Sequence, residues 1–169
     1  MPRVRVLGHD PGSRITGYGV VDCDSRTPRY VASGSIRTGE GEFAARLQEI
    51  YRGITALVEE FRTTEIAIER VFVHRNPDSA LKLGQARGAA LCATFAVAAA
   101  VHEYSPREVK LAVAGTGAAG KDQVQRMVKS LLSLQGRLGA DASDALAIAL
   151  CHAHGRATRQ VFAAAGRRR

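Results

Sequence analysis

The stretch RVRVLGHDPGSRITGYGV, residues 3–20, holds two segments of alternating apolar and polar residues that are separated by the turn-forming cluster DPGSR. A second such cluster, DSRTP, precedes a third alternating segment. Strands joined by connections this short pair in antiparallel fashion, so the sequence predicts a three-stranded meander. Its strands are expected over residues 3–10, 16–24 and 28–37.

The remainder of the chain combines helix and strand patterns. Apolar residues recur at helical period from Phe43 to Phe61, which predicts an amphipathic helix. The segment EIAIERVFV (65–73) predicts a strand that is buried on both faces. The elements expected after it are a helix from Asp78, a strand over AVHEY (100–104), a helix after SPRE (105–108), a helix over 122–134 and a helix from Asp141. This order predicts an α/β fold: a five-stranded mixed sheet, three antiparallel strands and then two parallel ones, flanked by helices on both faces.

Length and composition indicate one soluble globular domain. The chain has 169 residues, of which 46% are hydrophobic and 24% are charged. Its longest apolar run (91–101) is too short for a membrane span, and the N-terminus lacks the pattern of a signal peptide, so no membrane association is expected. The three cysteines are scattered and odd in number, which favours reduced thiols in the cytoplasm.

The chain is strongly basic, with a formal net charge of +8 and a pI near 10.0. Such an excess favours a polyanionic partner, nucleic acid before membrane. Residues 156–169 hold five arginines and no acid. We therefore expect a single domain over residues 1–155, followed by a basic, disordered C-terminal tail over 156–169.

The acids that stand out by position are Asp10, Glu69, Asp141 and Asp144. Three of them have a purely structural explanation. Asp10 precedes Pro-Gly, as turn-forming aspartates do, and the two later acids have the spacing of the N-cap and N3 residues of a helix. Glu69 is harder to explain in this way, because an unpaired carboxylate in a buried strand costs several kcal/mol.

The predicted fold would bring these acids together. The first and fourth strands, if adjacent and parallel, end at the same edge of the sheet, and a helix that begins beside them adds two more carboxylates. At about 4 Å, each pair of like charges costs on the order of 4 kcal/mol at an effective dielectric constant near 20. Hard divalent cations remove this conflict: oxygen ligands suit Mg²⁺ or Mn²⁺, and two such ions suit hydrolysis of a phosphodiester.

The segment GTGAAGKD (115–122) gives a competing signal, because it fits G-x-G-x-x-G and most of a nucleotide-binding P-loop. Asp122, however, stands where the P-loop has the Ser or Thr that holds Mg²⁺. The residues before the loop have a helical pattern, whereas a dinucleotide-binding loop follows a strand. Nucleotide binding therefore stays the alternative function, which measurable binding of ATP or NAD would favour.

Five segments carry a family resemblance: LGHDPGSRITGYGVVD, AIERVF, NPDSALKLGQARG, VKLAVAGTGAAGKDQVQRMV and DASDALAIALCHAH. Together they cover about residues 3–155 and resemble the RuvC family of crossover junction endodeoxyribonucleases, bacterial Holliday-junction resolvases with a ribonuclease H-like fold. The resemblance implies a cytoplasmic enzyme that acts at the nucleoid. It also implies symmetric nicking of two strands of a four-way DNA junction, which leaves 5′-phosphate and 3′-hydroxyl ends.

The resemblance also implies roles for individual residues. The family's metal-binding catalytic acids match Asp10, Glu69, Asp141 and Asp144, with two Mg²⁺ ions per subunit expected and Mn²⁺ as a substitute. Its two functional lysines match Lys110 and Lys121, of which Lys121 would neutralise charge on the scissile phosphate. An aromatic that engages junction bases matches Phe72. From the residues alone, solvated lysines and a core phenylalanine stay open as alternatives.

The family works as a two-fold dimer, typically with the RuvA–RuvB branch-migration machinery. The helix predicted over 78–98 carries small residues that suit a close helix contact, namely Ala80, Gly84, Gly88 and Ala89. Packing against the protein's own sheet would explain them equally well. Arg75, Lys82 and Arg87 are candidates for phosphate contacts, with a solvated charged face as the alternative. Further alternatives are a junction-binding protein without catalysis, which the four acids disfavour, and a related nuclease that acts on RNA.

Two further features of the sequence involve histidine: His9 and the motif CHAH (151–154). His9 departs from the family's pattern, which usually has an aliphatic residue there, and strand alternation places its side chain with Leu7, on the face opposite Asp10. We expect a residue without a role in the chemistry, destabilising if it lacks a partner. The motif CHAH (151–154) has no second ligand pair nearby in the sequence, so Cys151 and His154 are expected to be packing or surface residues rather than zinc ligands.

Overall fold

The computed structural model describes residues 4–23, 27–70 and 76–166. Its elements, in chain order, are β1 (Arg5–Asp10), β2 (Ile15–Asp22), β3 (Arg29–Arg37), α1 (Phe43–Phe61), β4 (Glu65–Glu69), α2 (Pro77–Thr94), β5 (Ala100–Tyr104), α3 (Pro106–Ala114), α4 (Lys121–Leu131) and α5 (Ala140–Gly166). No helix in this described part of the chain is long and apolar enough to cross a membrane.

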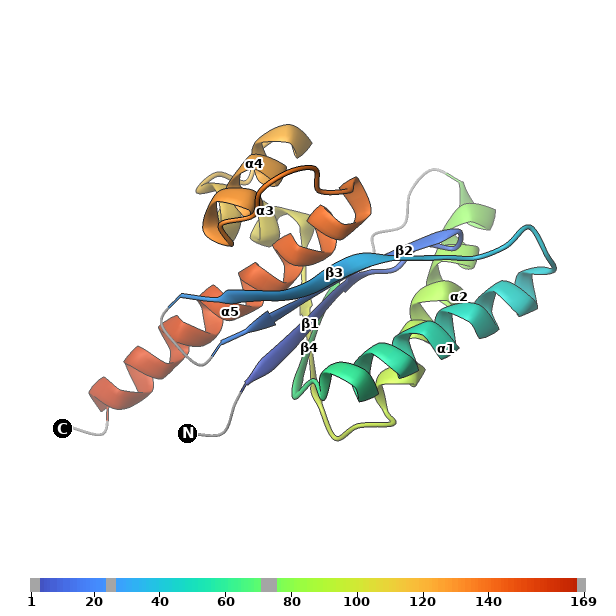
Figure 1. Cartoon of the computed structure of the whole chain (residues 1–169), viewed down its shortest axis with the longest axis horizontal. Helices are drawn as coiled ribbons and strands as arrows, with labels where there is room; N and C mark the ends of the chain where they lie inside the picture. Colours follow the sequence, from blue (N-terminus) through green and yellow to red (C-terminus); the bar gives the residue numbers. More distant parts are fainter. Residues whose placement is uncertain (1–3, 24–26, 71–75, 167–169) are drawn as a thin grey trace.

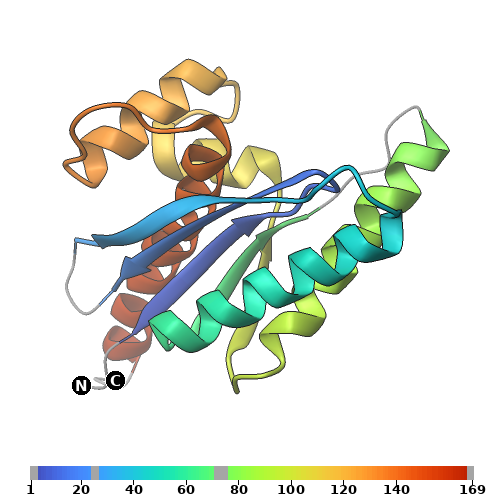
Figure 2. The ribbon, with the colours of Figure 1, turned by 45° about the vertical axis from the view of Figure 1, so that its right-hand side comes forward.

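The strands form one five-stranded sheet in the order β3-β2-β1-β4-β5. The pairs β1–β2 and β2–β3 are antiparallel, whereas β1–β4 and β4–β5 are parallel. Helices α1 and α2 cover one face, and α5 covers the other together with α3 and α4 (Figures 1 and 2). The predicted mixed sheet with helices on both faces is confirmed.

Alternation along β1 divides the core between the two faces. Val6 belongs to the apolar cluster beneath α5, and Leu7 belongs to the cluster beneath α1 and α2. Helix α5 lies unusually close to the sheet, because glycines provide the space: a Cβ atom at Gly8 would clash with the Ala145 carbonyl, and one at Gly17 with the Asp141 carbonyl. The start of α5 is thereby held against the backbone of β2.

One predicted boundary is wrong in a way that matters for the site. Strand β4 ends at Glu69, so this glutamate lies at a strand end, as Asp10 does, and not in a strand interior. Helix α5 begins at Ala140, close to the start expected near Asp141, so Asp141 lies in the first turn and Asp144 lies two residues beyond the N3 position. Capping therefore does not explain Asp144.

The C-terminal segment also differs from expectation. Helix α5 continues to Gly166, so most of the segment expected as a disordered tail is helical. Alanine and arginine recur in this segment, and both are favourable in helices. Arg156 and Arg159 therefore belong to the end of a helix, and the other three arginines lie outside the described residues.

Candidate active site

The carboxyl ends of β1 and β4 lie side by side in the sheet. The parallel register pairs His9 with Ile68, so the next residues along the two strands are Asp10 and Glu69. Both carboxylates are half-buried. The predicted meeting of these two acids at one sheet edge is thus present.

Helix α5 brings the other two acids to the same edge. Gly17 pairs with Asp10 across β1 and β2, and the Asp141 carbonyl lies directly against Gly17. Asp144 follows Asp141 by three residues, which places both side chains on one face of the helix. Asp144 is half-buried like the strand acids.

The electrostatics confirm that the carboxylates are close enough to repel one another. Burial, and then the charges of Glu69, Asp144 and Asp141, raise the pKa of Asp10 from 3.8 to about 7, against the opposing charge of Lys121. An increase of this size corresponds to about 4 kcal/mol that favours the protonated form. Asp10 is therefore the centre of an acid cluster whose negative charge is not fully compensated.

The same interactions act on the other members of the cluster. Burial and the charge of Asp144 raise the pKa of Glu69, against the charges of Lys121 and Lys110. Burial also raises the pKa of Asp144, and Lys121 opposes this shift. The structure thus brings together the four acids and both lysines that the sequence singled out.

The two lysines approach the cluster from α3 and α4. Lys121 is the first residue of α4, its side chain is 84% exposed, and its Nζ lies 3.6 Å from Asp144 Oδ2. Lys110 lies on α3 and is half-buried. Because Lys121 is so exposed, its ammonium is free to approach a phosphate that enters from solvent.

The donor set of this cluster fits hard divalent cations. All four candidate ligands are carboxylates, and oxygen-only sites suit Mg²⁺ and Mn²⁺. The raised pKa values of Asp10, Glu69 and Asp144 indicate a site that lacks positive charge. The carboxylates are spread out: among the described residues, no three of these acids bring ligand atoms within 4.8 Å of one another.

The residues expected to contact DNA differ in position and in exposure. Phe72 and Arg75 lie outside the described residues. Lys82 is exposed on α2 and forms an ion pair with Asp78 at 2.7 Å. Arg87 is turned inward, because its Nε donates to the Glu69 carbonyl at 3.4 Å and its Nη2 lies 2.8 Å from Glu103. Arg87 thus supports the backbone of an acid in the cluster instead of presenting a free charge to solvent.

His9 lies where strand alternation predicts. It is fully buried on the α2 side of the sheet, and neither ring nitrogen has a hydrogen-bond partner among the described residues. Burial, and then the nearby charge of Arg87, lower its pKa to about 3. His9 is therefore a neutral imidazole on the opposite face from Asp10, and the two do not form a catalytic pair.

Two hollows flank the acid end of the sheet. One, of about 530 Å³, is lined by Arg14, Ile15, Arg37, Thr38, Gly39, Glu40 and Arg46. The Arg46 guanidinium lies over the Phe43 ring, 5.1 Å from its centroid. The three arginines of this hollow come from three separate segments, so no local motif in the sequence could have revealed this basic surface.

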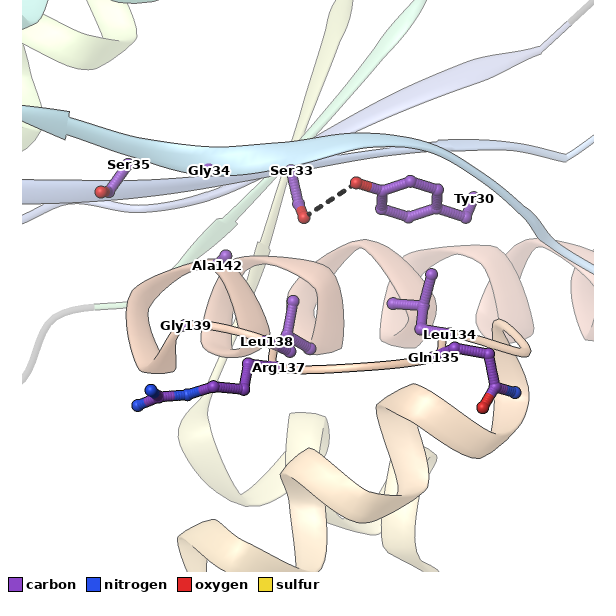
Figure 3. A pocket seen from close by; sticks show the side chains of 10 residues that line it. All are labelled: Tyr30, Ser33, Gly34, Ser35, Leu134, Gln135, Arg137, Leu138, Gly139 and Ala142. Carbon is purple, nitrogen blue, oxygen red and sulfur yellow. Dashed lines mark hydrogen bonds between the residues drawn. The ribbon is translucent and has the colours of Figure 1, made fainter.

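The second hollow, of about 450 Å³, lies between β3 and the segment that leads into α5 (Figure 3). Tyr30 and Ser33 line it from β3, with their hydroxyls 3.2 Å apart. Ala142, the neighbour of Asp141, lines its opposite side. This hollow therefore lies between the edge strand β3 and the start of α5.

The remaining motifs have structural roles. The loop 115–120 follows helix α3 and not a strand, with Gly115 as the left-handed C-cap, so the context that a dinucleotide-binding loop requires is missing. In the CHAH motif, Cys151 is buried in the core, and His154 Nδ1 lies 3.1 Å from the Ala112 carbonyl oxygen. Both residues therefore pack, as expected.

Comparison with known proteins agrees with this geometry. The sequence profile of the family described as crossover junction endodeoxyribonuclease RuvC matches residues 6–152. The protein of that name from Methylococcus capsulatus is 58% identical over 154 residues, which make up 91% of this chain and 93% of the relative. The one from Marinobacter nauticus is 59% identical over 149 residues, 88% of this chain and 85% of the relative.

Comparison of the backbone with solved structures agrees with the sequence comparison. The structure described as T. thermophilus RuvC in complex with Holliday junction substrate has a TM-score of 0.86 and 34% sequence identity, and the match covers 92% of this chain and 96% of the other. Profile, sequence and backbone thus confirm the resemblance that the motifs carry. The chain belongs to the RuvC family of crossover junction endodeoxyribonucleases.

Proposed function

We propose that this protein resolves Holliday junctions in recombination and repair by metal-dependent nicking of two strands. The observation that carries the proposal is the cluster of Asp10, Glu69, Asp141 and Asp144, in which burial and then mutual repulsion raise the pKa of Asp10 to about 7. A half-buried group of acids that only lysines oppose suits binding of cations together with a phosphate. Family membership supports the junction as substrate.

Each group in the cluster has a proposed role. Asp10 lies between the other acids, so we assign it to both cation positions, with Glu69 on one side and the α5 acids on the other. Two Mg²⁺ ions per subunit, or Mn²⁺, would supply Lewis-acid activation of water and stabilisation of the leaving 3′ oxygen. Lys121 neutralises charge on the scissile phosphate, and Lys110 limits the repulsion at Glu69. The water oxygen bonds to phosphorus as the bond to the 3′ oxygen breaks, which leaves a 5′-phosphate and a 3′-hydroxyl.

A junction contains two strands to cut, so we propose that the enzyme acts as a homodimer through α2. Five residues follow one another at helical spacing along this helix and its C-cap: Leu81, Gly84, Gly88, Cys92 and Phe95. Leu81 is 63% exposed and Phe95 is 72% exposed, which is unusual for large apolar side chains. A Cβ atom at Gly84 or Gly88 would meet nothing within 4 Å, so the protein's own sheet does not account for these glycines.

The hollow lined by Arg14, Arg37 and Arg46 supports a path for the DNA backbone toward the acid cluster. The net charge of +8 acts in the same direction. Such a substrate would place the enzyme at the nucleoid in the bacterial cytoplasm. A partnership with RuvA–RuvB follows from the family alone and stays a prediction.

The test is cleavage of a synthetic mobile four-way junction by the purified chain, with and without Mg²⁺. Linear duplex and RNA–DNA hybrid of the same sequence serve as controls, and Asp10→Asn serves as the matched inactive variant. We expect paired, ligatable nicks in the junction that require Mg²⁺ and are absent with the variant. Preferential cutting of the hybrid would instead assign the site to RNA, and junction binding without any cutting would leave only a binding protein.

A further inference from the structure

A second group of metal-ligand residue types lies at the other end of β4. Glu65, His102 and His152 each offer one ligand atom, and these atoms lie within 4.8 Å of one another. Within the described part of the chain, this is the one group of three or more such side chains gathered so closely. The three residues come from β4, β5 and α5, so they are separated in sequence and united only by the fold.

His152 is the buried centre of this group. Its Nε2 lies 2.5 Å from Glu65 Oε2, and its Nδ1 lies 2.7 Å from the Tyr104 hydroxyl. The His102 ring is beside it, with the two centroids 4.4 Å apart. Histidines that bind metals almost always engage their second ring nitrogen in a hydrogen bond, and Tyr104 supplies that partner here.

The carboxylate is also oriented. Arg156 Nε donates to Glu65 Oε1 at 3.0 Å, so the second oxygen, Oε2, is the one directed at His152. Glu65 is half-buried and is the first residue of its strand. A tetrahedral ion with bonds of about 2.0 Å needs neighbouring ligand atoms about 3.3 Å apart, so Oε2 must withdraw by about 0.8 Å for an ion to enter.

We propose that Glu65, His102 and His152 bind a transition-metal ion of the Zn²⁺ class at a site distinct from the acid cluster. Two imidazoles and one carboxylate form a ligand set that zinc adopts with water in the fourth position. Nitrogen ligands suit Zn²⁺ and Co²⁺, whereas the oxygen ligands of the acid cluster suit Mg²⁺ and Mn²⁺. The positive charge of Arg156 opposes the ion, so binding is expected to be reversible and not obligatory for folding.

The bound ion would cross-link three elements. Glu65 and Glu69 are four residues apart on β4, about 13 Å at the rise of a strand, so the ion would lie well away from the scissile phosphate. It would join α5 to the two parallel strands at the end of the sheet opposite the acids. The expected consequence is stabilisation by Zn²⁺ and not a change in the chemistry of cleavage.

The test is a titration of the metal-stripped full-length chain with Co²⁺, followed by visible absorption. A tetrahedral site with histidine ligands gives much stronger visible bands than a six-coordinate site of carboxylates and water. We expect these bands to saturate at one equivalent in the native chain and in Asp10→Asn. They should be lost, or should require at least tenfold more Co²⁺, in His102→Phe, and Cys92→Ser should leave them unchanged.

Thermal unfolding provides the second readout. Zn²⁺ should raise the melting temperature of the native chain and of Asp10→Asn, because an ion that binds only the folded state stabilises it. It should not raise that of His102→Phe. If His102→Phe fails to fold by circular dichroism, Glu65→Gln takes its place. Bands that persist in the folded variant, that disappear in Asp10→Asn, or that never form would overturn the proposal.

Discussion

The two ends of strand β4 carry the same residue type in opposite surroundings. Glu65 and Glu69 lie on the same face of the sheet, because they are separated by an even number of residues. At Glu69, burial and the charge of Asp144 raise the pKa. At Glu65, burial acts in the same direction, but hydrogen bonds from His152 and Arg156 outweigh it and hold the pKa below its usual value.

This difference separates a cluster whose negative charge is uncompensated from a carboxylate whose charge is compensated within the metal-free chain. At the Glu65 end, each carboxylate oxygen has a nitrogen partner within the chain. At the Glu69 end, the charges of other carboxylates act on Asp10 and Glu69, and Lys121 and Lys110 oppose them. The protein thus tolerates repulsion at the end where cations and a phosphate are expected, and compensates charge at the other.

The strongest test of this comparison exchanges the same chemical group at each end. Glu69→Gln is expected to lower the rate of junction cleavage by about 10³-fold or more, because a cation ligand contributes several kcal/mol to the transition state. Glu65→Gln, the matched control on the same strand, should cleave within about threefold of the native rate. The measurement is single-turnover cleavage of a labelled junction in Mg²⁺.

Binding of the junction without metal, measured by gel shift, should be similar for both variants. Cleavage by Glu69→Gln at a nearly native rate would remove Glu69 from the mechanism. An equal loss in both variants would show that the two ends of β4 do not differ in function.

The repulsion itself should appear in the pH dependence of stability. The folded-state pKa of Asp10 is raised to about 7, so the folded chain binds more protons than the unfolded chain between about pH 4 and pH 7, and stability falls as pH rises through this window. In the presence of chelator, the free energy of unfolding of Asp10→Asn should therefore exceed that of the native chain by up to about 4 kcal/mol at pH 8. Below pH 4 the difference should vanish. Urea unfolding at pH 8 and below pH 4 measures this difference in stability between the variant and the native chain. A difference that does not change with pH would contradict the raised pKa of Asp10.

At the Glu65 end of β4, the pH dependence of stability should have the opposite sign. Removing the charge with Glu65→Gln is expected to destabilise the metal-free chain at pH 7 by about 1–3 kcal/mol, the usual contribution of charged hydrogen bonds. Because the folded-state pKa of Glu65 is lowered, this stabilisation is present above pH 4.5 and is lost as the pH falls through the folded-state value. Unfolding in chelator from pH 7 to pH 3 follows the loss. A stabilised variant would show that the ion pairs do not offset the cost of burial.

The smallest effect concerns the two fully buried histidines. His152 has two partners, whereas His9 has none among the described residues. His9→Ile should therefore stabilise the chain by about 1 kcal/mol, since an unsatisfied buried polar group is removed. It should leave cleavage and its Mg²⁺ dependence unchanged. His152→Leu, the matched change, should destabilise, and a destabilised His9→Ile would indicate an unrecognised partner for His9.

The sequence alone predicted the sheet and the meeting of the acids, because both follow from local patterns and strand order. Period-two alternation and short turns specify the β1–β3 meander, and the adjacency of β1 and β4 brings Asp10 and Glu69 together, although the end of β4 at Glu69 was not predicted. The last helix was predicted as well, but Asp144 was expected at its N3 position and lies two residues further along.

The contacts of His152 were not predictable for a different reason. Its hydrogen-bond partners Glu65 and Tyr104 lie on β4 and β5, far from it in the sequence, so only the assembled fold reveals them. The same holds for the hollow of Arg14, Arg37 and Arg46. Residues that act through long-range proximity leave no periodic signal in the sequence.

The glycines beneath α5 affect how the protein tolerates variation. At Gly17 even a single methyl group would meet the Asp141 carbonyl, so an alanine there would lift the helix that carries two of the acids. Such a protein would still present its basic surface to DNA. A mutagenesis screen that selects for loss of repair should therefore find inactivating changes at a residue with no chemistry of its own, and compensating changes in the first turn of α5.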